Sequence, residues 1–128
     1  MKKIIKTKQA PAPIGPYNQA ILAGNTLYIS GQIAFNPKTN QLILNSIEKE
    51  TKQVMENLKA ILKEENLTFE HVVKSSIFIS DMNNFTAINQ VYGSYFNVET
   101  APARETVEVA QLPKSVNVEI SMIAVKQF

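Results

Sequence analysis

The chain has no cysteine and only one histidine among its 128 residues. The absence of cysteine excludes disulfides, thiolate metal sites, iron–sulfur clusters and cysteine nucleophiles. Because His71 is the single histidine, a zinc site would need carboxylates for nearly all its ligands, and a catalytic triad would depend on this one residue. His71 lies in the short segment 69–72 beside an apparent turn. We therefore predict no metal centre and assign His71 no role.

Long apolar segments are absent as well. No apolar run approaches the roughly 20 residues of a membrane span, and the N-terminal segment Met1–Lys6 lacks the apolar stretch of a signal peptide. A cytoplasmic location without a membrane partner is the expectation. With 45% hydrophobic and 19% charged residues, the composition is that of an ordinary globular protein. We predict one domain, residues 1–128, around one core.

Arginine is nearly absent, because Arg104 stands alone against twelve lysines. Arginine supplies what lysine cannot, a planar and always charged fork that binds a carboxylate or phosphate through two parallel hydrogen bonds. Arg104 is therefore a candidate anion anchor, and the alternative is an arginine paired with a structural carboxylate. The lysines are concentrated in the first half, which has net charge +5 against −3 for the second. The N-terminal lysines have no interleaved aromatic residues, which favours solvated lysines along an edge strand over a nucleic-acid site.

Hydrophobic periodicity predicts an alternation of strands and helices. We expect strands at 4–7, 19–23, 26–30, 72–80, 104–110 and 116–125, and helices at 47–62 and 84–96. Gly24-Asn25 is typical of a tight hairpin turn, and Asn45 with Glu48 resembles a capping box before the first helix. This order predicts an α+β fold, with two helices on one face of a mostly antiparallel sheet.

The last two predicted strands assign side chains to opposite faces, since residues two apart share a face. One face of the last strand carries Val118, Ile120, Met122 and Ala124 and is expected beneath the helices. If Val107 and Val109 also join the core, then Arg104, Thr106 and Glu119 emerge together on the helix-free face. That face also carries the apolar Ile123 and Val125. We therefore expect another subunit to cover it.

Two glycine-containing motifs complete the pattern. Gly15-Pro16-Tyr17 places a tyrosine in a fixed turn, and Ser30-Gly31-Gln32 ends a strand with a glycine that permits close approach of a ligand. With these motifs the chain resembles the reactive intermediate deaminase family (Rid, or YjgF). The most specific blocks are Pro102-Ala103-Arg104, Leu112-Pro113 and Val118-Glu119-Ile120, with support from Asp81-Met82-Asn83, Phe85, Asn89, Tyr92 and Phe96.

The resemblance implies a chorismate-mutase-like fold with a six-stranded sheet, assembled as a homotrimer with a site between neighbouring subunits. It implies hydrolysis of 2-imino acids and their enamine tautomers, such as 2-iminobutanoate and 2-iminopropanoate, to 2-oxo acids and ammonia. Pyridoxal-phosphate enzymes that dehydrate threonine or serine would supply these substrates. No metal or bound cofactor would be required.

Carried over by position, the resemblance assigns roles to seven residues. Arg104 would bind the substrate carboxylate, and Glu119 would position or activate the attacking water. Further pocket residues would be Tyr17, Ser30, Gly31, Asn89 and Thr106.

The chain departs from the family pattern at two positions. Asn18 stands where Ser or Thr is common, and Glu105 replaces a residue that is usually small. Glu105 should point away from Arg104, yet a carboxylate so close could weaken anion binding. Two other functions remain open: a non-catalytic sensor of small carboxylates such as 2-oxo acids, and an RNA-directed role as an endoribonuclease or translation inhibitor. The preferred imino acid and the enzyme that supplies it do not follow from the sequence.

Overall fold

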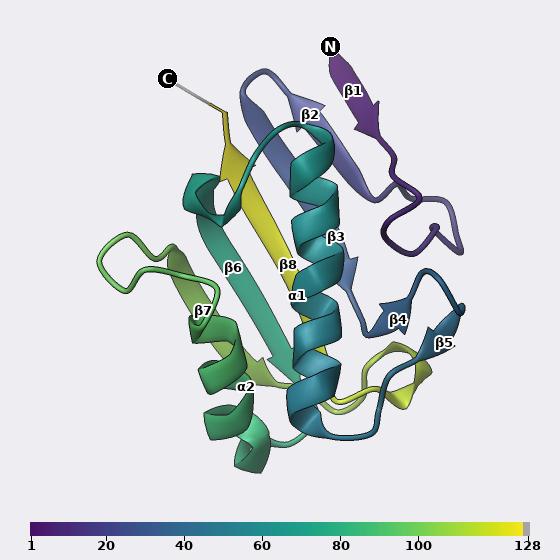
Figure 1. Cartoon of the computed structure of the whole chain (residues 1–128), viewed down its shortest axis with the longest axis vertical. Coiled ribbons are helices and arrows are strands. Elements are labelled where there is room, and N and C mark those ends of the chain that lie inside the picture. The colour runs from purple at the N-terminus through teal and green to yellow at the C-terminus, as the bar shows by residue number, and fades with distance from the viewer. Residues whose placement is uncertain (127–128) are drawn as a thin grey trace.

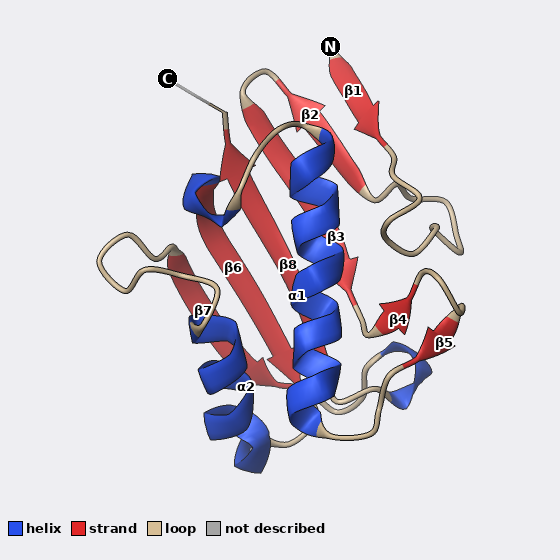
Figure 2. Cartoon of the chain, in the orientation of Figure 1, coloured by secondary structure: helices blue, strands red, loops and turns tan. Residues whose placement is uncertain are grey.

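The computed structural model describes residues 1–126, which form a six-stranded sheet with two helices on one face (Figures 1 and 2). The strands of this sheet are β1 (Lys2–Ile5), β2 (Ala20–Ala23), β3 (Thr26–Gln32), β6 (Val72–Ile79), β7 (Ala103–Glu108) and β8 (Val118–Val125). The helices are α1 (Ile47–Glu64) and α2 (Phe85–Gly93), with short 3-10 helices η1 (Phe69–His71), η2 (Met82–Asn84) and η3 (Pro113–Ser115). A small separate hairpin joins β4 (Phe35–Asn36) to β5 (Gln41–Leu42).

The strand order is β1-β2-β3-β8-β6-β7, and only the β6–β7 pair is parallel. The parallel pair requires a crossover, and α2 is part of the connection that supplies it. The predicted α+β layout is therefore confirmed. Within residues 1–126, no helix combines the length and apolar character that crossing a membrane requires.

Helix α1 covers the centre of the sheet with an apolar stripe. Val54, Leu58 and Ile61 recur at three- and four-residue steps and are fully buried. The helix begins after Ser46, whose side chain accepts a hydrogen bond from the Lys49 backbone N–H at 3.1 Å. The predicted capping box one residue earlier was therefore wrong.

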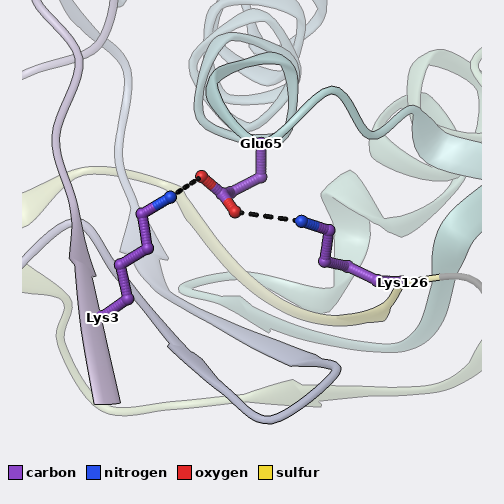
Figure 3. A network of polar contacts seen from close by, with 3 residues as sticks. All are labelled: Lys3, Glu65 and Lys126. Carbon is purple, nitrogen blue, oxygen red and sulfur yellow. Dashed lines mark hydrogen bonds and ion pairs between the residues drawn. The ribbon is translucent and has the colours of Figure 1, made fainter. Parts of the chain in front are cut away.

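One carboxylate at the C-terminal end of α1 contacts lysines from the N-terminal and the C-terminal parts of the chain. Glu65 lies 2.9 Å from the Lys3 ammonium and 3.3 Å from the Lys126 ammonium, as Figure 3 shows. The hydrogen bond from Lys3 lowers the pKa of Glu65; burial opposes this, and Lys126 adds to it. One of the N-terminal lysines on edge strand β1 is thus paired with a buried acid instead of being only solvated.

Strand β8 alternates as predicted, and its inward row is fully buried: Val118, Ile120, Met122 and Ala124. The opposite face of the sheet has no helix and exposes apolar side chains. The pairing registers align Ile4, Ile21, Tyr28 and Ile123 in one row across four strands. Tyr28 is 50% exposed and Ile4 47% exposed. These four residues form what we call the apolar row.

Strand β7 corrects the predicted arrangement of the faces. Its parallel register places Arg104 beside Ser75 and Thr106 beside Ile77, and both partners are buried beneath the helices. Arg104 and Thr106 therefore lie on the helix side, while Val107 lies on the helix-free side and is 40% exposed. Val107 misled the prediction because β7 is an edge strand, where an apolar residue does not have to face the core.

Candidate functional site

Arg104 is held by three side chains from one face of α2. Its Nη1 donates to Asn89 Oδ1 at 2.6 Å, and the guanidinium lies 5.8 Å from the ring centre of Phe85 and 5.2 Å from that of Tyr92. Residues 85, 89 and 92 share a helix face because they are spaced by four and three. Both distances are within the range of cation–π attraction. The residue remains exposed, so the rest of its fork is open to a ligand.

No carboxylate among residues 1–126 lies within ion-pair distance of Arg104. The alternative of a structural ion pair within the chain therefore has no support in the described residues. Glu105 lies on the opposite face, as predicted, where its carboxylate contacts the Lys74 ammonium at 2.8 Å and the Ser76 hydroxyl. These contacts, with Lys74 the stronger, lower the pKa of Glu105. Its charge is thus matched locally and directed away from Arg104.

Two polar side chains lie beneath the Arg104 cluster. The Tyr92 hydroxyl donates to Ser75 Oγ at 2.9 Å, and burial raises the pKa of Tyr92, so the ring stays neutral beside the cation. Thr106 follows Arg104 on the same face of β7. Its buried Oγ1 has no hydrogen-bond partner among the described residues. An unpaired buried hydroxyl is uncommon and indicates a place for a ligand or an ordered water.

Glu119 belongs to a second cluster on the helix-free face. It lies over Gly31 at a bulge in the β3–β8 pairing, and a Cβ added to Gly31 would be 2.8 Å from Glu119 Oε2. A side chain at position 31 would therefore displace the Glu119 carboxylate from its present position. Burial raises the pKa of Glu119, and no cation among residues 1–126 pairs with it.

Tyr17 and Gly31 line one small cavity of about 50 Å³ between the N-terminal loop and the end of β3. The backbone N–H of Ile14 donates to the Tyr17 hydroxyl at 3.4 Å. Ser30 is beside this cavity, and its hydroxyl donates to the Asn18 carbonyl at 2.6 Å. The Ser30 side chain is therefore already used to hold the turn that carries Tyr17. A larger open groove of about 640 Å³ runs along α1, and none of the predicted site residues lines it.

The predicted site residues thus form two clusters. Arg104, Asn89 and Thr106 form the anion cluster, on the helix side of an edge strand. The carboxylate cluster consists of Glu119, Gly31 and Ser30, on the helix-free side, together with Tyr17, which shares the small cavity with Gly31. Sequence reasoning missed the support that Phe85, Tyr92 and Ser75 give to the anion cluster. The available signal was the spacing of residues 85, 89 and 92, which places them on one helix face, together with the presence of a single arginine in the chain.

Comparison with known proteins places the chain among close relatives. The family model described as Endoribonuclease L-PSP matches residues 7–126. A RutC family protein of Synechocystis is 53% identical over 124 residues, 96% of this chain and 95% of that protein. A Capra hircus protein named 2-iminobutanoate/2-iminopropanoate deaminase is 44% identical over 126 residues, 98% of this chain and 91% of that protein.

A solved structure extends the agreement to the fold. The crystal structure of E. coli TdcF with bound serine matches with a TM-score of 0.92 at 39% identity, covering 98% of this chain and 99% of that one. The match spans all elements that carry the two clusters. The chain therefore belongs to the endoribonuclease L-PSP family, which is the Rid (YjgF) family.

Proposed function

We propose that the chain is a cofactor-free deaminase that hydrolyses 2-imino acids and their enamine tautomers to 2-oxo acids and ammonia. The observation that carries the proposal is the pair of complementary clusters, one a pre-positioned arginine fork and the other a partly buried carboxylate that no cation within residues 1–126 pairs with. The Capra hircus relative bears the name of this activity, and the TdcF structure contains serine, an amino acid with a carboxylate.

The anion cluster is suited to the substrate carboxylate. Asn89 occupies one N–H of the guanidinium, and the two aromatic rings limit its rotation, so the remaining donors keep a fixed direction. Such pre-organisation lowers the entropy lost when the anion binds. The Thr106 hydroxyl would gain its missing hydrogen bond from the bound ligand or from a water beside it.

The carboxylate cluster is suited to handling protons. Glu119, ionised, accepts a proton from water as the water oxygen attacks the imine carbon, and it returns that proton to the nitrogen to give a carbinolamine. Ionised again, Glu119 removes the hydroxyl proton and passes it to the amine nitrogen while the carbon–nitrogen bond breaks and ammonia leaves. A raised pKa makes the carboxylate a better general base. An imine carbon is already electrophilic, so positioning and one proton carrier are sufficient.

The separation of the clusters leads to the proposed assembly. Since they lie on opposite faces of the sheet, we propose a homotrimer in which the anion cluster of one subunit meets the carboxylate cluster of its neighbour. Packing of the apolar row against another subunit would remove exposed apolar surface from water. Sedimentation of the purified protein tests the stoichiometry, and a monomer would contradict it.

A coupled assay tests the activity. A threonine dehydratase generates 2-iminobutanoate in the presence of semicarbazide, and the protein competes with this trap. Faster formation of 2-oxobutanoate with less semicarbazone is the expected result, and an Arg104→Ala variant should lose the effect. A sensor of carboxylates would bind 2-oxobutanoate without affecting the trap. Glu119→Gln separates the two functions, because binding should persist while turnover falls.

A further inference from the structure

Helix α1 contains a buried acid that belongs to neither cluster. Glu50 is 0% exposed, and no cation among the described residues pairs with it. Its carboxylate accepts three hydrogen bonds from the start of β8: 2.7 Å from Asn117 Nδ2, 2.8 Å from the Asn117 backbone N–H, and 3.2 Å from the Val118 backbone N–H. A buried carboxylate is costly unless hydrogen bonds satisfy it. Glu50 therefore holds its donors, Asn117 and the Val118 backbone N–H, in place.

The backbone that Glu50 fixes follows a strained turn. Lys114 and Ser115 both have positive φ angles, 58° and 54°, although neither is glycine. Two such residues in succession are unfavourable and persist only where the surroundings hold them. Leu112 and Val116 are buried on either side of the turn and anchor it in the core.

Asn117 also connects Glu50 to the end of β6. The Ser80 backbone N–H donates to the Asn117 carbonyl at 3.1 Å, and the Ser80 hydroxyl donates to Asn117 Oδ1 at 3.4 Å. The chain then continues through η2 into α2, which holds Arg104 through Asn89. Glu50, Asn117 and Ser80 therefore form a junction between two segments of the site. Asn117 lies two residues before Glu119, and Ser80 precedes η2 and the helix that carries Asn89.

We propose that Glu50 is a positioning residue for Glu119, acting through Asn117 and the first N–H groups of β8. The inference rests on the proposed function, in which Glu119 carries the proton. Because side chains alternate along a strand, a slip of one residue would turn Glu119 into the core. Smaller shifts at the start of β8 would move its carboxylate away from Gly31, where Oε2 now lies 2.8 Å from the position of a Cβ.

Exchanging the carboxylate of Glu50 and the amide of Asn117 between the two positions tests this assignment. In Asn117→Asp a second carboxylate faces Glu50 in place of the amide that donated a 2.7 Å hydrogen bond. We expect kcat to fall about 10- to 100-fold, while KM changes less than about twofold. Glu50→Gln keeps one acceptor oxygen for the backbone N–H groups, so its loss should be smaller. In the double variant the amide introduced at position 50 donates to the carboxylate introduced at position 117, and kcat should return to within about threefold of wild type.

The matched control is Glu48→Gln, which removes an exposed carboxylate from the same first turn of α1 and should leave kcat unchanged. The proposal is overturned if the single variants unfold at lower temperature but keep the wild-type kcat when folded. It is equally overturned if the double variant folds and is no more active than Asn117→Asp.

A second readout separates this proposal from the proposed function. The ionisation of Glu119 can be followed by carbon-13 NMR of its carboxyl group, assigned through Glu119→Gln. If Glu50 positions Glu119, the pKa of Glu119 should fall toward its ordinary value in Asn117→Asp and recover in the double variant. An inactive wild type with this NMR response would reject the deaminase activity and keep the positioning role. An unchanged pKa in all variants would reject the positioning role.

Discussion

Replacing Arg104 tests whether the lone arginine acts as a two-point anchor. One N–H of the guanidinium is committed to Asn89, and the remaining donors are enough for two parallel bonds to a carboxylate. Each charge-assisted hydrogen bond contributes about 1.5–3 kcal/mol. Loss of both in Arg104→Ala should therefore lower kcat/KM by about 10²–10⁴, at about 1.4 kcal/mol for each factor of ten.

Arg104→Lys is the sharper variant, because it keeps the charge and removes the fork. An ammonium makes one direct contact instead of two and lacks the planar surface that lies beside Phe85 and Tyr92. We expect kcat/KM to stay at least about tenfold below wild type, since one bond and part of the cation–π attraction are lost. The semicarbazide competition assay measures both variants. A lysine variant with a near-normal rate would refute the two-point role.

Three further predictions concern Glu119, Glu65 and Tyr92. The pKa of Glu119 is raised, so its contribution to stability is present at low pH and is lost as pH rises through the folded value. Glu119→Gln should thus raise the melting temperature at pH 8 more than at pH 5, while turnover falls. An equal change in melting temperature at both pH values would contradict burial of the charged carboxylate as the cause. The pKa of Glu65 is lowered, so its contribution is present above the ordinary value of 4.5 and is lost as pH falls through the folded value. Urea unfolding between about pH 6 and pH 3 should show a weaker acid dependence in Glu65→Gln, and an unaltered dependence would exclude this residue as the cause. Tyr92→Leu removes a ring beside the guanidinium and should raise KM about two- to tenfold, whereas Tyr92→Phe keeps the ring and should change KM less; equal effects would reject the cation–π contribution.

The fold was largely predictable from the sequence because its signals are local. The stripe of α1 and the alternation of β8 each place a buried face without reference to the rest of the chain. Element ends were less predictable: the first strand lies at Lys2–Ile5 instead of 4–7, and α2 ends at Gly93.

The arrangement of the site could not be predicted in the same way. Which face of β7 carries Arg104 depends on its register with β6, a contact set by tertiary structure. The role of Glu50 depends on a contact 67 residues away in sequence. The bulge that places Glu119 over Gly31 likewise has no signal beyond the glycine itself.

Mixing two inactive variants tests the central claim most directly. Arg104→Ala keeps an intact carboxylate cluster, and Glu119→Gln keeps an intact anion cluster. If sites form between subunits, refolding the two chains together should yield mixed oligomers in which some sites contain both Arg104 and Glu119, and activity should appear in the coupled assay. If the mixture stays as inactive as either variant alone although mixed oligomers are present, the proposed shared site is wrong.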